Sequence, residues 1–299
     1  MNRLLYHTLT RMTKGNISGK PIRSAGCLII GDEILNGKIL DTNSYNFARF
    51  CFKDLSIPLK RTIVCGDDED DIKKCLDMLI KDDLDFIVTS GGLGSTHDDI
   101  TYEVISKYFN VDCKLDKEVV DRMNSIRGDY LNKLNPEQKN AFYRMATIPY
   151  PTPENSSVKV EKYFLDDKLW FPIVELNEQV YILPGVPQLF TQLIQDMKPM
   201  LQSRAISSNL MRRYVSTKTG ETQLAPFLTR LQHECDEKFG KGVLKLGSYP
   251  HMNLHINTIS VIGTNLNKEQ LDWVVNSVIE NVGGGAKEIS QEQEDENSK

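Results

Sequence analysis

The chain has 299 residues, of which 40% are hydrophobic and 26% are charged, and its formal net charge is −5. This length allows one large domain, or a medium domain and a small one, with a proper core. No apolar run approaches the roughly eighteen residues of a membrane helix, and the negative charge argues against broad nucleic-acid binding. The six cysteines form no Cys-x-x-Cys pair, so we expect them to be reduced core residues.

The first 24 residues are basic and contain no acidic residue. Arginine and lysine alternate there with leucine, methionine and hydroxyl side chains, a composition typical of mitochondrial targeting segments. A disordered basic tail explains the same residues. We therefore expect residues 1–24 to stand outside the folded domains, and the protein to be mitochondrial or cytoplasmic, with this segment favouring mitochondria.

From residue 25 onward, short apolar runs alternate with segments of helical periodicity. Strands are expected over residues 25–30, 59–64, 85–89 and 180–183, and helices over residues 42–55, 68–81, 118–127 and 136–145. Strands separated by helices predict a parallel sheet with helices on both faces. We expect an α/β domain with a doubly wound, mostly parallel sheet over residues 25–203.

A second, smaller α+β domain is expected over residues 204–285. Its predicted strands cover residues 213–218 and 254–261, and its predicted helices cover residues 221–237 and 268–282. The segment Gly247-Ser248-Tyr249-Pro250 reads as a turn that forms a wall of the active site or a dimer contact. Tyr249 would stack there on an aromatic ring, although a packed turn tyrosine is the simpler interpretation. Residues 286–299 are rich in acidic side chains and predict a disordered tail.

Four polar loops follow the predicted strands. They read Gly31-Asp32-Glu33-Ile34-Leu35, Cys65-Gly66-Asp67-Asp68, Thr-Ser-Gly-Gly-Leu-Gly-Ser-Thr-His-Asp-Asp-Ile-Thr over residues 89–101, and Leu183-Pro184-Gly185-Val186-Pro187. Taken singly, glycine–aspartate pairs usually make turns. In a doubly wound sheet, however, the carboxyl ends of the strands meet at one edge, so the four loops predict a single pocket.

The third loop carries the clearest chemistry. Glycines let backbone N–H groups converge on an anion, so we expect the N–H groups of residues 92–96 to hold a phosphate. The neighbouring carboxylates of Asp98 and Asp99 repel each other unless a cation or a helix N-terminus lies beside them. The loop therefore predicts a phosphate held by a metal. In the alternative interpretation, Asp98 caps the helix that begins near Ile100 and Asp99 stabilises its first turn.

Together, the first, third and fourth loops resemble the molybdopterin-binding domain superfamily of the MoaB/MogA type. Within it, they resemble the CinA-like branch, which includes the N-terminal domain of eukaryotic FAD synthases. Residues 219–221 and 246–250 resemble the second domain of that branch, which is similar in fold to RNA-binding KH modules. The chain lacks the Gly-x-x-Gly loop of such modules, so no nucleic-acid binding is expected. It departs from the branch at Ser95, where proline is common, and at His97, where arginine is frequent.

The resemblance implies a metal-dependent hydrolase that cleaves the pyrophosphate linkage of a nucleotide such as ADP-ribose or FAD and releases AMP. Asp67 and Asp99 match catalytic aspartates of the family, and with Glu33 they are expected to bind Mg²⁺, Mn²⁺ or Co²⁺. The expected substrate-binding residues are Gly31, Thr42, Asn43, Gly91, Gly92, Gly94, Ser95, Thr96, Gly185, Pro187 and Tyr249. We also expect a homo-oligomer, either a dimer or a trimer, and no membrane partner.

Two other functions stay open. The first is molybdopterin binding with adenylyl transfer or molybdate insertion, as in molybdenum cofactor synthesis. The second is a non-catalytic module that binds a nucleotide or a partner. The extra second domain favours the CinA-like branch, and the acidic residues at positions 67 and 99 argue against loss of catalysis.

Overall fold

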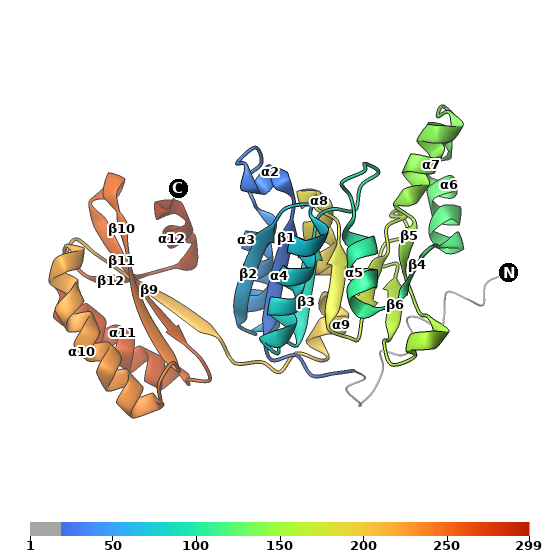
Figure 1. Cartoon of the computed structure of the whole chain (residues 1–299). Coiled ribbons are helices and arrows are strands. Elements are labelled where there is room, and N and C mark those ends of the chain that lie inside the picture. Colours follow the sequence, from blue (N-terminus) through green and yellow to red (C-terminus); the bar gives the residue numbers. More distant parts are fainter. Residues whose placement is uncertain (1–18, 299) are drawn as a thin grey trace. The chain divides into compact units, whose positions relative to one another are not determined.

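The structure is a computed structural model that describes residues 19–298, and the chain divides into two compact units between Ile206 and Ser207 (Figure 1). The predicted targeting segment falls mostly on residues 1–18, which lie outside the described residues. No helix among the described residues is long and apolar enough to cross a membrane.

The first unit is built on a six-stranded sheet in the order β2-β1-β3-β8-β7-β6. Its strands are β1 (Ala25–Ile30), β2 (Leu59–Cys65), β3 (Phe86–Ser90), β6 (Val160–Tyr163), β7 (Ile173–Leu176) and β8 (Val180–Leu183). Strands β2, β1, β3 and β8 are parallel, whereas β7 is antiparallel to both β8 and β6. The predicted α/β fold with a mostly parallel sheet is confirmed, and the antiparallel edge adds to it.

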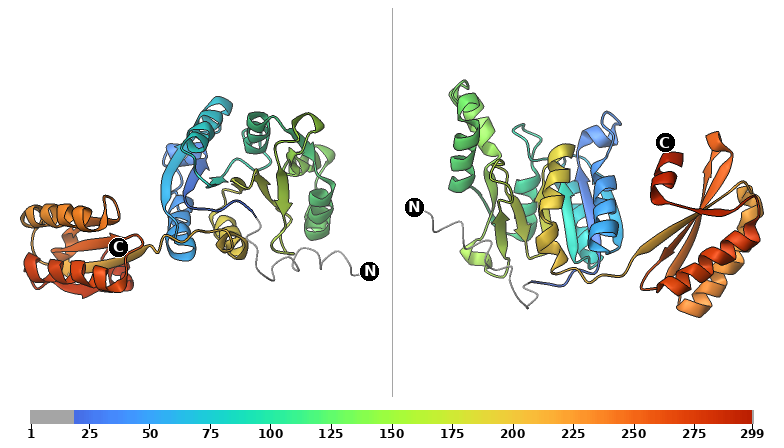
Figure 2. Two further views of the ribbon diagram at one scale, coloured as in Figure 1. Left: turned by 90° about the horizontal axis from the view of Figure 1, so that it is seen from below. Right: turned by 180° about the vertical axis from the view of Figure 1, so that it is seen from behind.

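Helices cover both faces of this sheet. On one face lie α4 (Glu69–Lys81) and α5 (Thr101–Phe109), and on the other lie α3 (Asn43–Arg49), α8 (Pro187–Asp196) and α9 (Lys198–Gln202). Figure 2 shows the second face toward the viewer in its right panel. Strand β1 is buried along its whole length and feeds both cores, Leu28 and Ile30 on one side and Cys27 and Ile29 on the other. This two-sided burial explains its continuous apolar sequence.

The remaining elements of the first unit lie around the sheet. They are α2 (Asp32–Leu35), η2 (Phe50–Leu55), α6 (Lys117–Leu131), α7 (Pro136–Arg144), η3 (Pro153–Asn155) and a two-stranded antiparallel sheet of β4 (Asp112–Leu115) and β5 (Thr147–Tyr150). The helix predicted over residues 42–55 changes character at Phe50, where the π-helix η2 follows α3. A left-handed Ser56, with φ of 52°, ends this segment.

The second unit has an antiparallel sheet in the order β10-β11-β9-β12. Its elements are β9 (Met211–Thr217), α10 (Glu221–Phe239), β10 (Leu244–His251), η4 (Met252–Leu254), β11 (Ile256–Gly263), α11 (Lys268–Val282), β12 (Lys287–Ile289) and α12 (Gln291–Asn297). Helices α10 and α11 share one apolar core with the sheet, so the predicted α+β class is confirmed. The segment predicted as a turn at residues 247–250 is instead part of β10, where it pairs with β11.

The acidic end of the chain is folded as far as residue 298. Strand β12 pairs with β9, and Ser290 caps α12 by accepting a hydrogen bond from the N–H of Gln293. Glu294 is buried, and its Oε1 lies 3.3 Å from Nε2 of His251 in β10. The prediction of a disordered tail over residues 286–299 is therefore wrong for residues 287–298, because the acidic segment contains a strand that pairs with β9 and a buried contact between Glu294 and His251.

Candidate active site at the carboxyl ends of the parallel strands

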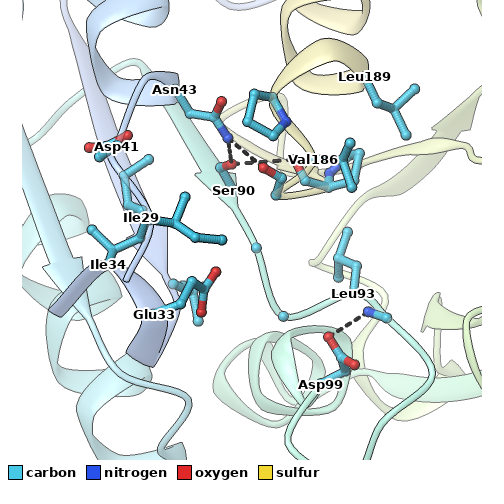
Figure 3. Close-up of a pocket in the computed structure, with 18 of the residues that line it drawn as sticks. Ile29, Glu33, Ile34, Asp41, Asn43, Ser90, Leu93, Asp99, Val186 and Leu189 are labelled. Carbon is cyan, nitrogen blue, oxygen red and sulfur yellow. Dashed lines mark hydrogen bonds between the residues drawn. The ribbon is translucent and has the colours of Figure 1, made fainter. Parts of the chain in front are cut away.

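Loops that follow β1, β3 and β8 enclose a pocket of about 420 Å³ (Figure 3). Parallel strands end at the same edge of a sheet, which brings these distant loops together. The predicted site residues that line the pocket are Glu33, Thr42, Asn43, Gly91, Gly92, Gly94, Asp99, Gly185 and Pro187. The other predicted residues of this unit, Gly31, Asp67, Ser95 and Thr96, lie in the adjoining loops outside the pocket wall. Tyr249 belongs to β10 of the second unit, and its part in substrate binding stays a prediction.

Gly91 lets the loops after β1 and β3 touch. A Cβ atom at this position would lie 1.9 Å from the carbonyl oxygen of Ile30, and the φ of Gly91 is +117°. Both observations require glycine. A Cβ atom on Gly185 would lie 3.1 Å from Cα of Gly91, so the loop after β8 also approaches backbone to backbone. The three loops therefore meet without room for a side chain between them.

The carboxylate of Asp99 occupies part of the predicted phosphate cradle. Its Oδ1 accepts the N–H of Gly94 at 2.6 Å, and its Oδ2 accepts the N–H of Thr96 at 2.9 Å together with the Thr96 hydroxyl. Within residues 19–298, the N–H groups of Gly92, Leu93 and Ser95 have no hydrogen-bond partner. Because Gly92 and Leu93 line the pocket, their N–H groups are the donors left for an anion.

Asp98 does not cap helix α5. That helix begins at Thr101 with Ile100 as its N-cap residue, and no side chain accepts a hydrogen bond there. Asp98 is exposed, as is His97, whose side chain is 98% exposed. The alternative interpretation, in which Asp98 caps the helix, is therefore wrong.

Asp67 lies between the loops after β1 and β3. Its Oδ2 accepts the N–H of Asp32 at 2.9 Å, and its Oδ1 lies 3.5 Å from the place of a Cβ atom on Gly92. Burial raises the pKa of the Asp67 carboxyl, and the charges of Glu33, Asp32 and Asp98 raise it further, while the hydrogen bond from Asp32 opposes them. Negative charge thus accumulates here, where a cation would relieve it.

Glu33 and Asp67 are the carboxylates that fit a divalent cation. Asp99 has both oxygens engaged by the glycine loop, and among the described residues only Cys65, Asp71 and Cys75 place three ligand atoms within 4.8 Å of one another. The three expected acids therefore do not form a complete site by themselves. Mg²⁺ needs only one or two carboxylates when water and substrate phosphate supply its other ligands. The residues present fit an ion that is shared with a phosphate group.

Asn43 presents an unsatisfied acceptor at the pocket. Its Nδ2 donates to the carbonyl oxygen of Gly185 at 2.8 Å and to Oγ of Ser90 at 2.9 Å (Figure 3). The Gly185 carbonyl can only accept, which fixes the orientation of the amide. Asn43 is 6% exposed, and its Oδ1 is buried without a partner among the described residues. A bound group that donates an N–H or O–H would satisfy it.

Apolar side chains that the sequence did not single out form much of the remaining wall. They are Ile29, Ile34, Ile39, Leu40, Leu93, Met145, Phe171, Val186 and Leu189. The ring of Phe171 stacks on Trp170 with 3.9 Å between ring centroids. Such a surface suits a planar ring system. No motif marks Met145 or Phe171, since the tertiary fold alone brings them to the pocket.

Arg144, the last residue of α7, supports the glycine loop from outside the large pocket. Its Nη1 donates to the carbonyl oxygen of Thr96 at 2.8 Å, and its Nη2 donates to Glu103 at 3.2 Å. This cation therefore holds the loop in place. No motif in the sequence marks this role, because Arg144 is an ordinary charged residue at a helix end.

Comparisons with known proteins identify the family of the first unit. The family described as "Probable molybdopterin binding domain" matches residues 26–203. A "Probable FAD synthase" of Caenorhabditis elegans is 28% identical over 269 residues, which cover 88% of this chain and 50% of that protein. A "CinA-like protein" of Mycobacterium leprae is 30% identical over 197 residues, which cover 65% of this chain and 42% of that protein.

The chain spans about half the length of these two relatives. It spans 87% of a protein of Pyrococcus abyssi, with 27% identity over 231 residues and 75% of this chain covered. Among solved structures, the protein CinA from Thermoplasma acidophilum has 27% sequence identity and a TM-score of 0.47, with 60% of this chain and 98% of that chain covered.

Proposed function

Since this chain belongs to the family described as "Probable molybdopterin binding domain", we propose that it hydrolyses the pyrophosphate linkage of a nucleotide with the help of a divalent metal. FAD and ADP-ribose are the first substrates to consider, FAD because a relative carries the name of a probable FAD synthase. Water would add to one phosphorus atom as the bridging oxygen leaves with the other. AMP is then one of the two products.

The observation that carries this proposal is the position of Asp67. The carboxylate of Asp67 lies beside Gly92, a residue of the pocket wall whose N–H has no acceptor among the described residues. The negative charge of Glu33 acts on the same carboxylate and raises its pKa. Unpaired backbone N–H donors beside a partly buried carboxylate favour a phosphate that shares a divalent cation with that carboxylate. This combination favours phosphate chemistry over acyl transfer, for which the sequence has no Gly-x-Ser-x-Gly nucleophile motif.

The apolar part of the pocket would hold one ring of the substrate. Phe171, Leu93 and Leu189 offer flat or branched apolar surface, and Asn43 Oδ1 offers an acceptor for an amino or hydroxyl group. Adenine, isoalloxazine and ribose all carry such donors. The pyrophosphate would then reach the glycine loop, where the N–H groups of Gly92 and Leu93 orient it.

A bound Mg²⁺, Mn²⁺ or Co²⁺ would offset phosphate charge and lower the pKa of water. Asp67 and Glu33 would hold that ion. Asp67 Oδ1, which lies beside Gly92 at the pocket and accepts no hydrogen bond among the described residues, is our candidate to take a proton from the attacking water. Asp99 keeps the glycine loop in shape through Gly94 and Thr96, so its role is positional.

The test is AMP release by the purified chain from FAD, ADP-ribose and NAD, each with Mg²⁺, Mn²⁺, Co²⁺ or a chelator. We expect AMP only with metal, and a loss of at least 100-fold in Asp67→Asn, the order of effect of a general base. Asp98→Asn, an exposed neighbour with the same change of charge, is the matched control and should keep most of the activity. No AMP with any metal, or equal rates for the two variants, would contradict the proposal.

Molybdopterin binding is a second candidate, and the name of the family favours it. The buried Oδ1 of Asn43 would accept a hydrogen bond from a pterin amino group as readily as from adenine. A molybdopterin-type ligand that raises the melting temperature without any turnover, while FAD and ADP-ribose have no effect, would favour this candidate over hydrolysis.

A further inference from the structure

A second cluster of ligating side chains lies next to the Asp67 loop. Cys65 is the last residue of β2, and Asp71 and Cys75 stand one turn apart on α4. The two Sγ atoms and a carboxylate oxygen all lie within 4.8 Å of one another. Both cysteines are buried and neither forms a disulfide.

We propose that Cys65, Asp71 and Cys75 form a binding site for a thiophilic divalent cation such as Zn²⁺. Two sulfur atoms and one oxygen match the donors that Zn²⁺ takes in proteins, with a fourth position for water. This set differs from the all-oxygen ligands that Mg²⁺ prefers. The cluster would therefore prefer a thiophilic cation over Mg²⁺.

The separations fit a tetrahedral ion after small side-chain rotations. With Zn–S bonds of about 2.3 Å and Zn–O bonds of about 2.0–2.2 Å, the ligand atoms of a tetrahedron lie roughly 3.5–3.8 Å apart. Cys75 Sγ and Asp71 Oδ1 are already 3.8 Å apart, in a weak S–H···O contact. The other separations, at most 4.8 Å, would shorten by about 1 Å or less as the thiols lose their protons to solvent.

A metal bound to Cys65, Asp71 and Cys75 would also affect the loop that carries Asp67. The N–H of Gly66, which precedes Asp67, donates to Asp71 Oδ2 at 3.4 Å, a long bond that coordination of Asp71 would change. Resting on the proposed function, this coupling implies that metal at the cluster changes the rate of hydrolysis. The binding of Zn²⁺ itself does not depend on that function.

The experiment titrates the reduced, metal-free full chain with Co²⁺ and follows the thiolate-to-cobalt absorption band, with Zn²⁺ as competitor. We expect one Co²⁺ per chain with this band and its loss on addition of Zn²⁺. Cys65→Ser and Cys75→Ser should lose the band, and Asp71→Asn should bind at least tenfold more weakly. Cys235→Ser, a buried cysteine of the second unit, is the matched control and should keep it.

Asp67→Asn separates this proposal from the hydrolase proposal. It should abolish AMP release and keep the cobalt band, so the two proposals can fail independently. Circular dichroism checks that each variant is folded. If a cysteine variant unfolds, Asp71→Asn, which keeps both thiols, still tests the site through its weaker cobalt binding. A parent chain without the band, or a band that survives in folded Cys75→Ser, would overturn the site. Formation of a Cys65–Cys75 disulfide in air without cobalt binding would overturn it as well.

Discussion

The carboxylate of Asp99 accepts the backbone N–H of Gly94 at 2.6 Å. A Cβ atom on Gly94 would lie 2.5 Å from Asp99 Oδ2, so the glycine is what lets the carboxylate come so near. The loop thereby binds an anion of its own, through the same kind of donor that binds phosphate in other proteins. We conclude that this aspartate shapes the loop, while Gly92 and Leu93 keep their N–H groups for a ligand.

Asp99→Ala should therefore destabilise the loop as well as slow the reaction. It leaves the N–H groups of Gly94 and Thr96 without their charged acceptor, which should lower the free energy of unfolding of the first unit by about 1–3 kcal/mol. Asp98→Ala removes an exposed carboxylate next door and should stay within about 0.5 kcal/mol of the parent. Urea denaturation of both variants measures this. Equal midpoints would show that the loop does not depend on Asp99.

Asp67→Asn should make the metal-free protein more stable near neutral pH. A carboxyl whose pKa is raised on folding contributes stability below its unfolded pKa, of about 3.9, and loses that contribution as pH rises through the folded pKa. An uncharged asparagine avoids this loss. The melting temperature of Asp67→Asn in chelator should exceed that of the parent at pH 7, and the difference should shrink toward about pH 3.5.

Addition of Mg²⁺ provides the matching control. It should raise the melting temperature of the parent, since the ion relieves the repulsion between Asp67, Glu33 and Asp32, and it should leave Asp67→Asn almost unchanged. If Asp67→Asn melts at or below the melting temperature of the parent in chelator at pH 7, burial and the neighbouring acids do not destabilise the Asp67 carboxylate.

Asn43→Ala should weaken substrate binding more than catalysis. It removes the buried acceptor Oδ1 and the donor that links Ser90 to Gly185, so KM should rise by about tenfold or more, equivalent to about 1.4 kcal/mol per factor of ten. Asn46→Ala is the matched control. It lies one turn further along α3, and its Nδ2 donates to Thr191 at 3.1 Å outside the pocket wall. Steady-state kinetics with FAD should separate the two variants, and similar KM values would refute the role of Asn43.

Removal of residues 287–299 should destabilise the second unit. The truncation takes away the β12 pairing with β9, the buried side chain of Ile289 and the contact between Glu294 and His251. Burial of one isoleucine contributes about 1.5–3 kcal/mol, so we expect a loss of about 2–4 kcal/mol when the other contacts are included. Urea denaturation of a chain that ends at Ala286 measures this, and Ile289→Ala should show part of the effect. An unchanged unfolding curve would mean that this end contributes nothing.

The central strands are predictable from the sequence because burial on both faces of the sheet requires a short run of apolar residues. Strand β1 is a continuous apolar run and strand β3 begins with three apolar residues, and their predicted bounds lie within one residue of the observed ones. Strands β4, β5, β6 and β7 have four residues each and contain polar residues or proline among their apolar ones, whereas the equally short β8 is wholly apolar. Strand β10 contains Gly247 and Pro250, residues typical of turns, and only its pairing with β11 makes it a strand.

The site was predictable as a set of loops but not as a set of contacts. The alternation of strands and helices predicts parallel strands that end at one edge of the sheet, so glycines and acids of distant loops are expected together. The hydrogen bond from the Gly94 N–H to the Asp99 carboxylate depends on the backbone conformation of the loop. No residue spacing in the sequence predicts it. Phe171 and Arg144 reach the pocket and its loop from the middle of the chain, where the sequence has no motif.

The stacking of Trp170 on Phe171 has a practical consequence. The chain has two tryptophans, and the other, Trp273, packs against Phe239 in the second unit. Each unit thus carries a single tryptophan, and the one in the first unit stacks on Phe171 of the pocket wall. In Trp273→Phe, all tryptophan emission comes from Trp170, whose ring stacks on Phe171 of the pocket wall. Ligand binding can then be followed as a change in tryptophan fluorescence, without a label and without turnover.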